Sequence, residues 1–102
     1  MSILLIDDEK LIERADVVAR TFEDGIEKLS NAKWDELLLD NYLGVNDPKK
    51  TGVYVIIWLL EHPEYQPKKI TVVSSNPEVL AEFIEETLDY ERESDITFIK
   101  KE

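Results

Sequence analysis

The residues best suited to chemistry in this sequence are carboxylates that directly follow two apolar runs. Asp7 and Asp8 come after the run at residues 3–6, and Asp40 comes after the run at residues 37–39. If both runs are strands of one parallel sheet, their carboxyl ends share an edge, and these side chains converge in one crevice. Like charges tolerate such crowding when a cation lies among them or when one group is protonated. Carboxylate oxygens with room for water suit Mg²⁺, so we expect an acidic magnesium pocket.

A simpler interpretation is that these acids only fill loop and helix-capping positions. Asp8 is well placed to cap a short first helix. Asp40 comes immediately after an apolar run, where a capping or solvating side chain is less needed. The position of Asp40 therefore favours the pocket.

The apolar runs that must position these acids are short and continuous. Four of them lie at residues 3–6, 37–39, 70–73 and 96–99, and a weaker run with polar ends lies at residues 16–20. Continuous apolarity is typical of strands that are covered on both faces, as in a parallel sheet, and polar ends suit an edge strand. We predict five strands.

Helical signals separate these runs. Thr21 followed by Asp24 resembles a capping box and predicts a helix over residues 22–30. Residues 53–60 are apolar on almost every side and predict a buried helix that ends before Pro63, although their β-branched side chains also permit a strand.

Asn76 and Pro77 open a further predicted helix, with an apolar stripe at helical spacing. The alternation of strands and helices predicts an α/β domain with a doubly wound parallel sheet. Only residues 7–15 separate the first two strands, so the first helix has at most about two turns.

Composition limits the class of protein. The chain has 102 residues, a length that suits one domain over residues 1–102, and it contains no cysteine, which excludes disulfides and thiolate metal sites. Its formal charge of −11 repels phosphate backbones and anionic membrane surfaces, so we expect neither nucleic acid nor a membrane as a partner. A start without a basic segment and an apolar run too short to span a bilayer favour a cytoplasmic location.

Two segments resemble response-regulator receiver domains, namely residues 3–9 (ILLIDDE) and residues 37–40 (LLLD). The resemblance implies a flavodoxin-like receiver fold with three layers and five strands in the order 2-1-3-4-5, here with the shortened first helix that the spacing predicts. It also implies that Mg²⁺ is held by Asp7, Asp8, Asp40 and the main-chain carbonyl of Tyr42.

The same resemblance implies roles for the remaining candidate residues. Asp40 would be the phosphoacceptor, Ser74 would contact the phosphoryl group, and the receiver lysine falls at Lys100 or Lys101. Positive charge around an acyl phosphate matters because uncompensated repulsion in a partly dry pocket costs about 4 kcal/mol per contact.

A closer resemblance is to the cyclic-phosphate-processing receivers, and it lies in residues 20–21, 39–44, 51–55, 58–59 and 74–77. In that subgroup a histidine and a second aspartate follow the acceptor, and another histidine precedes the serine. This sequence has Asn41, Tyr42 and Val73 at those positions, so neither proton-transfer group is present. Asn76 either caps its helix or faces the pocket, as the subgroup implies.

Three functions remain open. The first is a two-component phosphoacceptor switch, in which a histidine kinase or a small phosphodonor modifies Asp40 and the signal passes to another protein. The second is a receiver fold that binds a protein partner without phosphorylation. The third is hydrolysis of a cyclic phosphate, for which we expect no turnover because the two histidines are missing.

Overall fold

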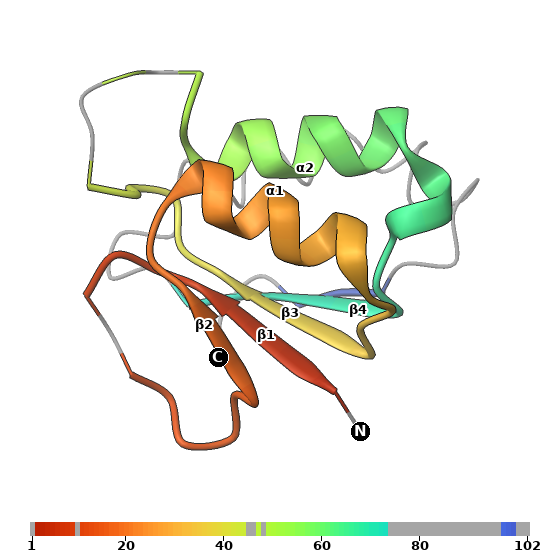
Figure 1. Ribbon diagram of the computed structural model, residues 1–102, viewed down its shortest axis with the longest axis horizontal. Coiled ribbons are helices and arrows are strands. Elements are labelled where there is room, and N and C mark those ends of the chain that lie inside the picture. The colour runs from red at the N-terminus through yellow and green to blue at the C-terminus, as the bar shows by residue number, and fades with distance from the viewer. Residues whose placement is uncertain (1, 10, 45–46, 48, 74–96, 100–102) are drawn as a thin grey trace.

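A parallel β-sheet lies at the centre of the computed structural model (Figure 1). Its strands are β1 (Ile3–Ile6), β2 (Val17–Ala19), β3 (Glu36–Leu39) and β4 (Lys69–Val72), and they lie in the order β2-β1-β3-β4. A short segment, β5 (Thr97–Ile99), pairs in parallel with β4. The structure describes residues 2–9, 11–44, 47, 49–73 and 97–99.

The α/β class and the parallel sheet are therefore confirmed, and the four strands follow the predicted order. The predicted helix after Asn76 lies outside the described residues, and β5 is described only as three residues. The complete three-layer, doubly wound, five-stranded sheet consequently stays a prediction.

Two helices lie on the same face of the sheet (Figure 1). Helix α1 (Phe22–Asn31) begins at the predicted residue, and Thr21 Oγ1 accepts a hydrogen bond of 3.1 Å from the main-chain nitrogen of Asp24. Helix α2 (Gly52–Glu61) confirms the helical alternative for its apolar segment, and a 3₁₀ turn, η1 (Pro63–Tyr65), follows it. In the part of the chain that is described, no helix combines the length and apolarity needed to cross a bilayer.

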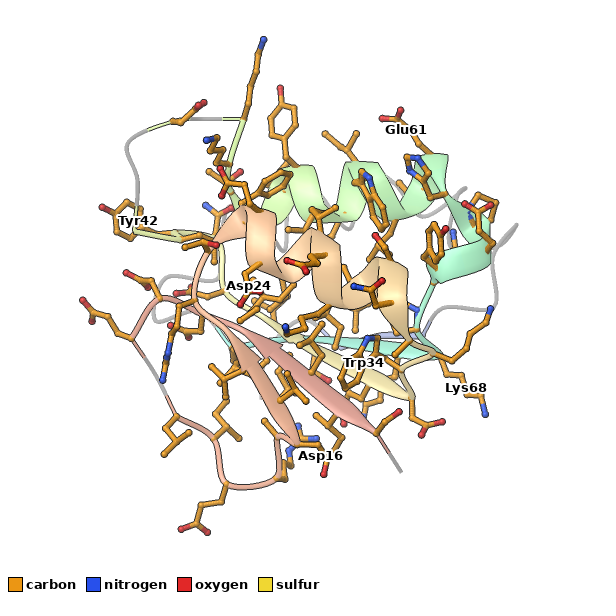
Figure 2. All side chains as sticks on the ribbon, viewed as in Figure 1. Asp16, Asp24, Trp34, Tyr42, Glu61 and Lys68 are labelled. Carbon is orange, nitrogen blue, oxygen red and sulfur yellow. The ribbon has the colours of Figure 1, made fainter. Side chains whose placement is uncertain are left out.

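The core between these helices and the sheet depends on the alternation of side chains along each strand. On the helix-covered face, the fully buried strand residues are Leu4, Ile6, Ala19, Leu37, Leu39, Ile70 and Val72. Trp34 packs at the border of this cluster, where its Nε1 donates a hydrogen bond of 2.9 Å to the carbonyl oxygen of Lys28 (Figure 2). The opposite face carries a second cluster of Ile3, Leu5, Leu38 and Val73.

The connection between β1 and β2 differs from the prediction of a short first helix. Its described residues contain one turn, in which the Ala15 nitrogen donates to the Ile12 oxygen, and no helix. Only a few residues are available to return the chain to the start of a parallel strand. An extended segment suits this return, because it advances about 3.3 Å per residue against 1.5 Å for a helix. Ile12 and Ala15 instead pack directly on the second cluster.

Candidate functional site

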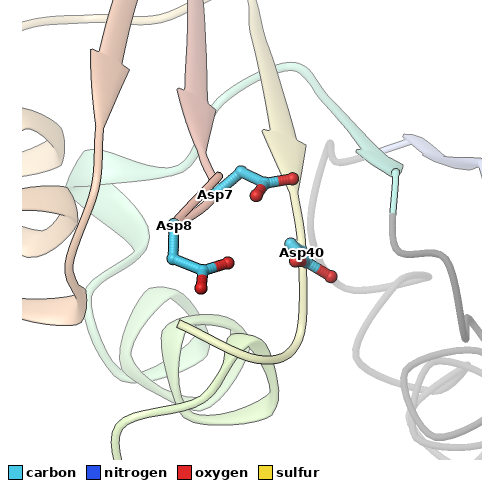
Figure 3. Close-up of side chains that lie close together, drawn as sticks. All are labelled: Asp7, Asp8 and Asp40. Atoms are coloured by element: carbon cyan, nitrogen blue, oxygen red, sulfur yellow. The ribbon is translucent and has the colours of Figure 1, made fainter. Parts of the chain in front are cut away.

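Three carboxylates converge beyond the carboxyl ends of two adjacent strands. Asp7 and Asp8 follow β1, and Asp40 follows β3, which is hydrogen-bonded to β1 in parallel. One carboxylate oxygen from each residue lies within 4.8 Å of the others, and Figure 3 shows the side chains around a common space. The predicted convergence is thus present.

The members of this acidic cluster differ in burial and in what orients them. Asp7 is 1% exposed, whereas Asp8 and Asp40 are partly exposed. Asp7 Oδ1 accepts a hydrogen bond of 3.0 Å from the Glu9 nitrogen, and Asp40 Oδ1 accepts one of 2.8 Å from the Asn41 nitrogen. These bonds to the main chain fix two of the carboxylates before any ligand arrives.

Asn41 joins the acidic cluster to the first turn of α2. Its carbonyl oxygen accepts from the Gly52 nitrogen at 2.8 Å, and its Oδ1 lies 3.4 Å from the Val53 nitrogen, which donates to it. A Cβ atom at Gly52 would lie only 2.3 Å from the carbonyl oxygen of Asp40, so glycine is required for this approach. The amide of Asn41 therefore serves as a helix cap, a role that the sequence analysis did not predict.

The loop after Asn41 forms one wall of the site. Leu43 is 1% exposed and anchors this loop in the main core, whereas the Tyr42 side chain is 55% exposed and points outward (Figure 2). Gly44 has φ of +82°, and a Cβ there would lie 3.4 Å from the Cβ of Asp8. The loop thus passes Asp8 at van der Waals distance in a backbone conformation that favours glycine.

Arg20 brings a positive charge to the same edge. It follows β2, and its Nη1 donates a hydrogen bond of 3.2 Å to the carbonyl oxygen of Asp7. The sequence analysis did not single out this residue as part of the site. The available signals were its position at the end of the predicted edge run, residues 16–20, and its place in the segment 20–21 that resembles the receiver subgroup.

The donors of the acidic cluster fit a small divalent cation. All are carboxylate oxygens, from one buried and two partly exposed residues, and hard oxygen donors with access to water are what Mg²⁺ prefers. The other predicted site residues, Ser74, Asn76, Lys100 and Lys101, lie outside the described residues.

The single histidine of the chain lies at the other end of α2. His62 follows the last residue of that helix, its Nδ1 lies 2.8 Å from the Trp58 carbonyl oxygen, and its ring stacks on Trp58 with the centroids 4.5 Å apart. The acidic cluster lies at the Gly52 end of α2, so His62 does not replace the histidines that the subgroup uses.

A further acidic side chain is buried at the amino-terminal end of the strands. Glu36 is 4% exposed and accepts hydrogen bonds from Arg14 Nη1 and from Thr71 Oγ1, the latter at 2.6 Å, while Lys69 Nζ lies 3.7 Å from its Oε2. Burial alone would raise the pKa of Glu36, but these hydrogen bonds and the charges of Arg14 and Lys69 outweigh it and hold the pKa below its ordinary value.

Comparison with known proteins adds one match. A family model described as the cyclic-phosphate processing receiver domain matches residues 2–96. No curated protein matches the chain.

Proposed function

Because the chain belongs to the family of cyclic-phosphate processing receiver domains, we propose that it is a receiver-like signalling module in which Asp40 accepts a phosphoryl group. The observation that carries this proposal is the convergence of Asp40 with Asp7 and Asp8 at the carboxyl edge of the sheet. This edge, at a change in strand order, is where open α/β sheets bind their ligands.

The proposed chemistry is transfer of a phosphoryl group to a carboxylate. An oxygen of Asp40 forms a bond to phosphorus, and the bond breaks from phosphorus to the donor atom, which is a nitrogen in a phosphohistidine and an oxygen in acetyl phosphate. The donor leaves with that electron pair. Two features support this role: the Asn41 nitrogen orients the carboxylate, and the side chain is partly exposed and therefore accessible to a phosphodonor.

We propose that Asp7, Asp8 and Asp40 hold Mg²⁺ together with the main-chain carbonyl of Tyr42. When bound, the cation would neutralise charge on the transferred group. Asp7 is already oriented by the Glu9 nitrogen, which reduces the reorganisation needed for binding.

The remaining roles are proposals that follow from the family. Ser74 would contact the phosphoryl group, Asn76 would cap its helix or face the pocket, and Lys100 or Lys101 would neutralise the acyl phosphate. The complete domain would have three layers around five strands. The phosphodonor would be a histidine kinase or a small molecule in the cytoplasm, and a downstream protein would bind the modified state.

A second candidate function is hydrolysis of a cyclic phosphate, which the description of the family favours. Ring opening needs a general acid for the leaving oxygen, and neither Asn41 nor Val73 can transfer a proton. The amide of Asn41 is also engaged with the first turn of α2. We therefore place this activity second, and 2′,3′-cyclic nucleotides incubated with the protein and Mg²⁺ provide its test.

The phosphoacceptor proposal is tested by intact mass after incubation with acetyl phosphate and Mg²⁺. We expect one added phosphate in the wild type and in Ser74→Ala, and none in Asp40→Asn, because an amide cannot form the acyl phosphate. Asp16→Asn is the matched control, since Asp16 bonds to the Ile3 nitrogen at the far end of the sheet.

Three results would redirect the proposal. Wild-type protein that binds Mg²⁺ but gains no mass would favour a module that binds its partner without phosphorylation. A phosphate that persists in Asp40→Asn would place the modification on another residue. Turnover of a cyclic nucleotide that disappears in Asp40→Ala would make the hydrolase the first candidate.

A further inference from the structure

We propose that Arg20 helps the metal-loaded acidic cluster to bind a phosphate group. The inference rests on the proposed function, because it takes the divalent cation at Asp7, Asp8 and Asp40 as bound. It adds a residue of this chain that binds the phosphate directly.

The position of Arg20 follows from the pairing of β1 with β2. Ile6 is paired with Ala19, so the next residues along the two strands, Asp7 and Arg20, leave the sheet side by side. The Arg20 guanidinium then donates to the carbonyl oxygen of Asp7 at 3.2 Å. This bond holds the positive charge against the residue with the most buried carboxylate of the cluster.

The chemistry of the guanidinium suits a phosphate ligand. It presents five N–H donors in a planar fork that matches two phosphate oxygens. Arg20 is an exposed residue, and its Nη1 lies beside the Asp7 carbonyl oxygen at the carboxyl edge of the sheet.

The charges of the site explain why a cation is needed there. Three carboxylates carry −3, a divalent ion adds +2, and Arg20 adds +1, which brings the loaded site to neutrality. Without Arg20 the described residues of the site and the cation keep a formal charge of −1, which weakens the attraction of the site for a phosphate.

Several other basic side chains in the described part of the chain pair with acidic residues away from the cluster. Lys28 pairs with Asp24 on α1, and Lys50 pairs with Glu23 at the start of the same helix. Arg14 and Lys69 surround Glu36 at the opposite end of the strands.

The test compares Arg20→Gln, which removes the charge, with Arg20→Lys, which keeps it. The Kd for Mg²⁺ and the Kd for inorganic phosphate at saturating Mg²⁺ are measured by titration calorimetry at fixed ionic strength. In Arg20→Gln we expect Mg²⁺ to bind about 3-fold tighter, because a repelling charge is gone, and phosphate to bind about 10-fold weaker. In Arg20→Lys we expect the Kd for Mg²⁺ to stay within about 3-fold of the wild type, since the charge remains, and phosphate to bind about 3-fold weaker, because an ammonium lacks the planar fork.

In Arg20→Gln, tighter binding of Mg²⁺ together with weaker binding of phosphate indicates a phosphate-binding role and not a structural one. If Arg20 only holds the turn after β1, Arg20→Gln weakens Mg²⁺ and phosphate together, and the proposal is overturned. Two unchanged constants overturn it as well. If Arg20→Gln does not fold, Arg20→Lys decides, because a 10-fold loss of Mg²⁺ affinity in that variant marks a structural role.

The same titrations distinguish this inference from the proposed function. A wild type that binds no Mg²⁺ contradicts both. A wild type that binds Mg²⁺, accepts a phosphate mass at Asp40 and shows no dependence of phosphate affinity on Arg20 contradicts only the role of Arg20.

Discussion

Buried carboxylates lie at both ends of the central strands, and their neighbours differ. At the amino-terminal end, Glu36 is 4% exposed and is surrounded by Arg14, Lys69 and the hydroxyl of Thr71. At the carboxyl end, Asp7 is 1% exposed and shares its surroundings with two further carboxylates, those of Asp8 and Asp40.

Burial is nearly the same in the two places, so burial alone does not indicate function. At Glu36 the protein's own basic side chains neutralise the carboxylate, so this group stabilises the folded structure. At the acidic cluster like charges are held together, which is costly for folding and useful when a cation binds. The comparison predicts that the first region controls stability and the second controls binding.

The largest effect is expected from Glu36→Ala. This change leaves the Thr71 hydroxyl and the Arg14 guanidinium without their acceptor, and we expect a loss of about 3 kcal/mol in the free energy of unfolding, measured in urea. Glu23→Ala is the control, because Glu23 pairs with Lys50 on the surface, and it should leave the urea midpoint unchanged. Equal effects of the two changes would show that Glu36 contributes no more to stability than a surface ion pair.

The next effect is expected at the carboxyl end and comes from a glycine. In Gly52→Ala the new Cβ would lie 2.3 Å from the Asp40 carbonyl oxygen, so the first turn of α2 or the peptide of Asp40 must move. We expect a loss of about 2 kcal/mol in unfolding free energy and a weaker response of the melting temperature to Mg²⁺. An unchanged response to Mg²⁺ would show that Asp40 keeps its place while α2 alone adjusts.

A smaller effect, of opposite sign, is expected from Asp8→Asn. Without metal this change removes a repelling charge and should raise the unfolding free energy by about 1 kcal/mol. With millimolar Mg²⁺ the wild type should gain stability by mass action, and the variant should lose most of that gain. Thermal melts with and without Mg²⁺ give both values. A wild-type melting temperature that is the same with and without Mg²⁺ contradicts the metal site.

The smallest effect concerns pH. Because the pKa of Glu36 is held below its ordinary value, its contribution to stability is complete above the unfolded pKa of about 4.3 and is lost as the pH falls through the lower folded pKa. The difference in urea midpoint between wild type and Glu36→Gln should therefore be constant from pH 7 to about pH 5 and should shrink below about pH 4. A difference that stays constant to pH 3 would mean that Glu36 does not titrate as a stabilising carboxylate.

Local patterns predicted most of the described fold. The first strand begins and ends at the predicted residues, β2, β3 and β4 agree within one residue at each end, and the cap at Thr21 correctly marks the start of α1. The convergence of Asp7, Asp8 and Asp40 was also predictable, because parallel strands bring their carboxyl ends to one edge.

The features that the sequence analysis missed depend on partners that are distant along the chain. The cation pair around Glu36 needs Arg14 and Lys69, which approach it only when β1, β3 and β4 are in register. Likewise Arg20 reaches Asp7 because β2 is paired with β1. The described residues between β1 and β2 form no helix, because the chain must return to a parallel strand over a short distance in sequence. This constraint of the whole fold acts on a segment without a strong pattern of its own.

The short connection without a helix also bears on how the sheet assembles. Leu4 is paired with Val17 across this connection, whereas Ile3 is paired with Glu36 through α1. The entropy lost on closing a loop increases with its length, so the β1–β2 pair is the parallel contact with the lowest closure cost in the described sheet. Parallel sheets are usually slow to begin folding because their first contacts join residues that are distant in sequence. The β1–β2 pair joins residues that are closer in sequence, and β3 and then β4 can be added to it.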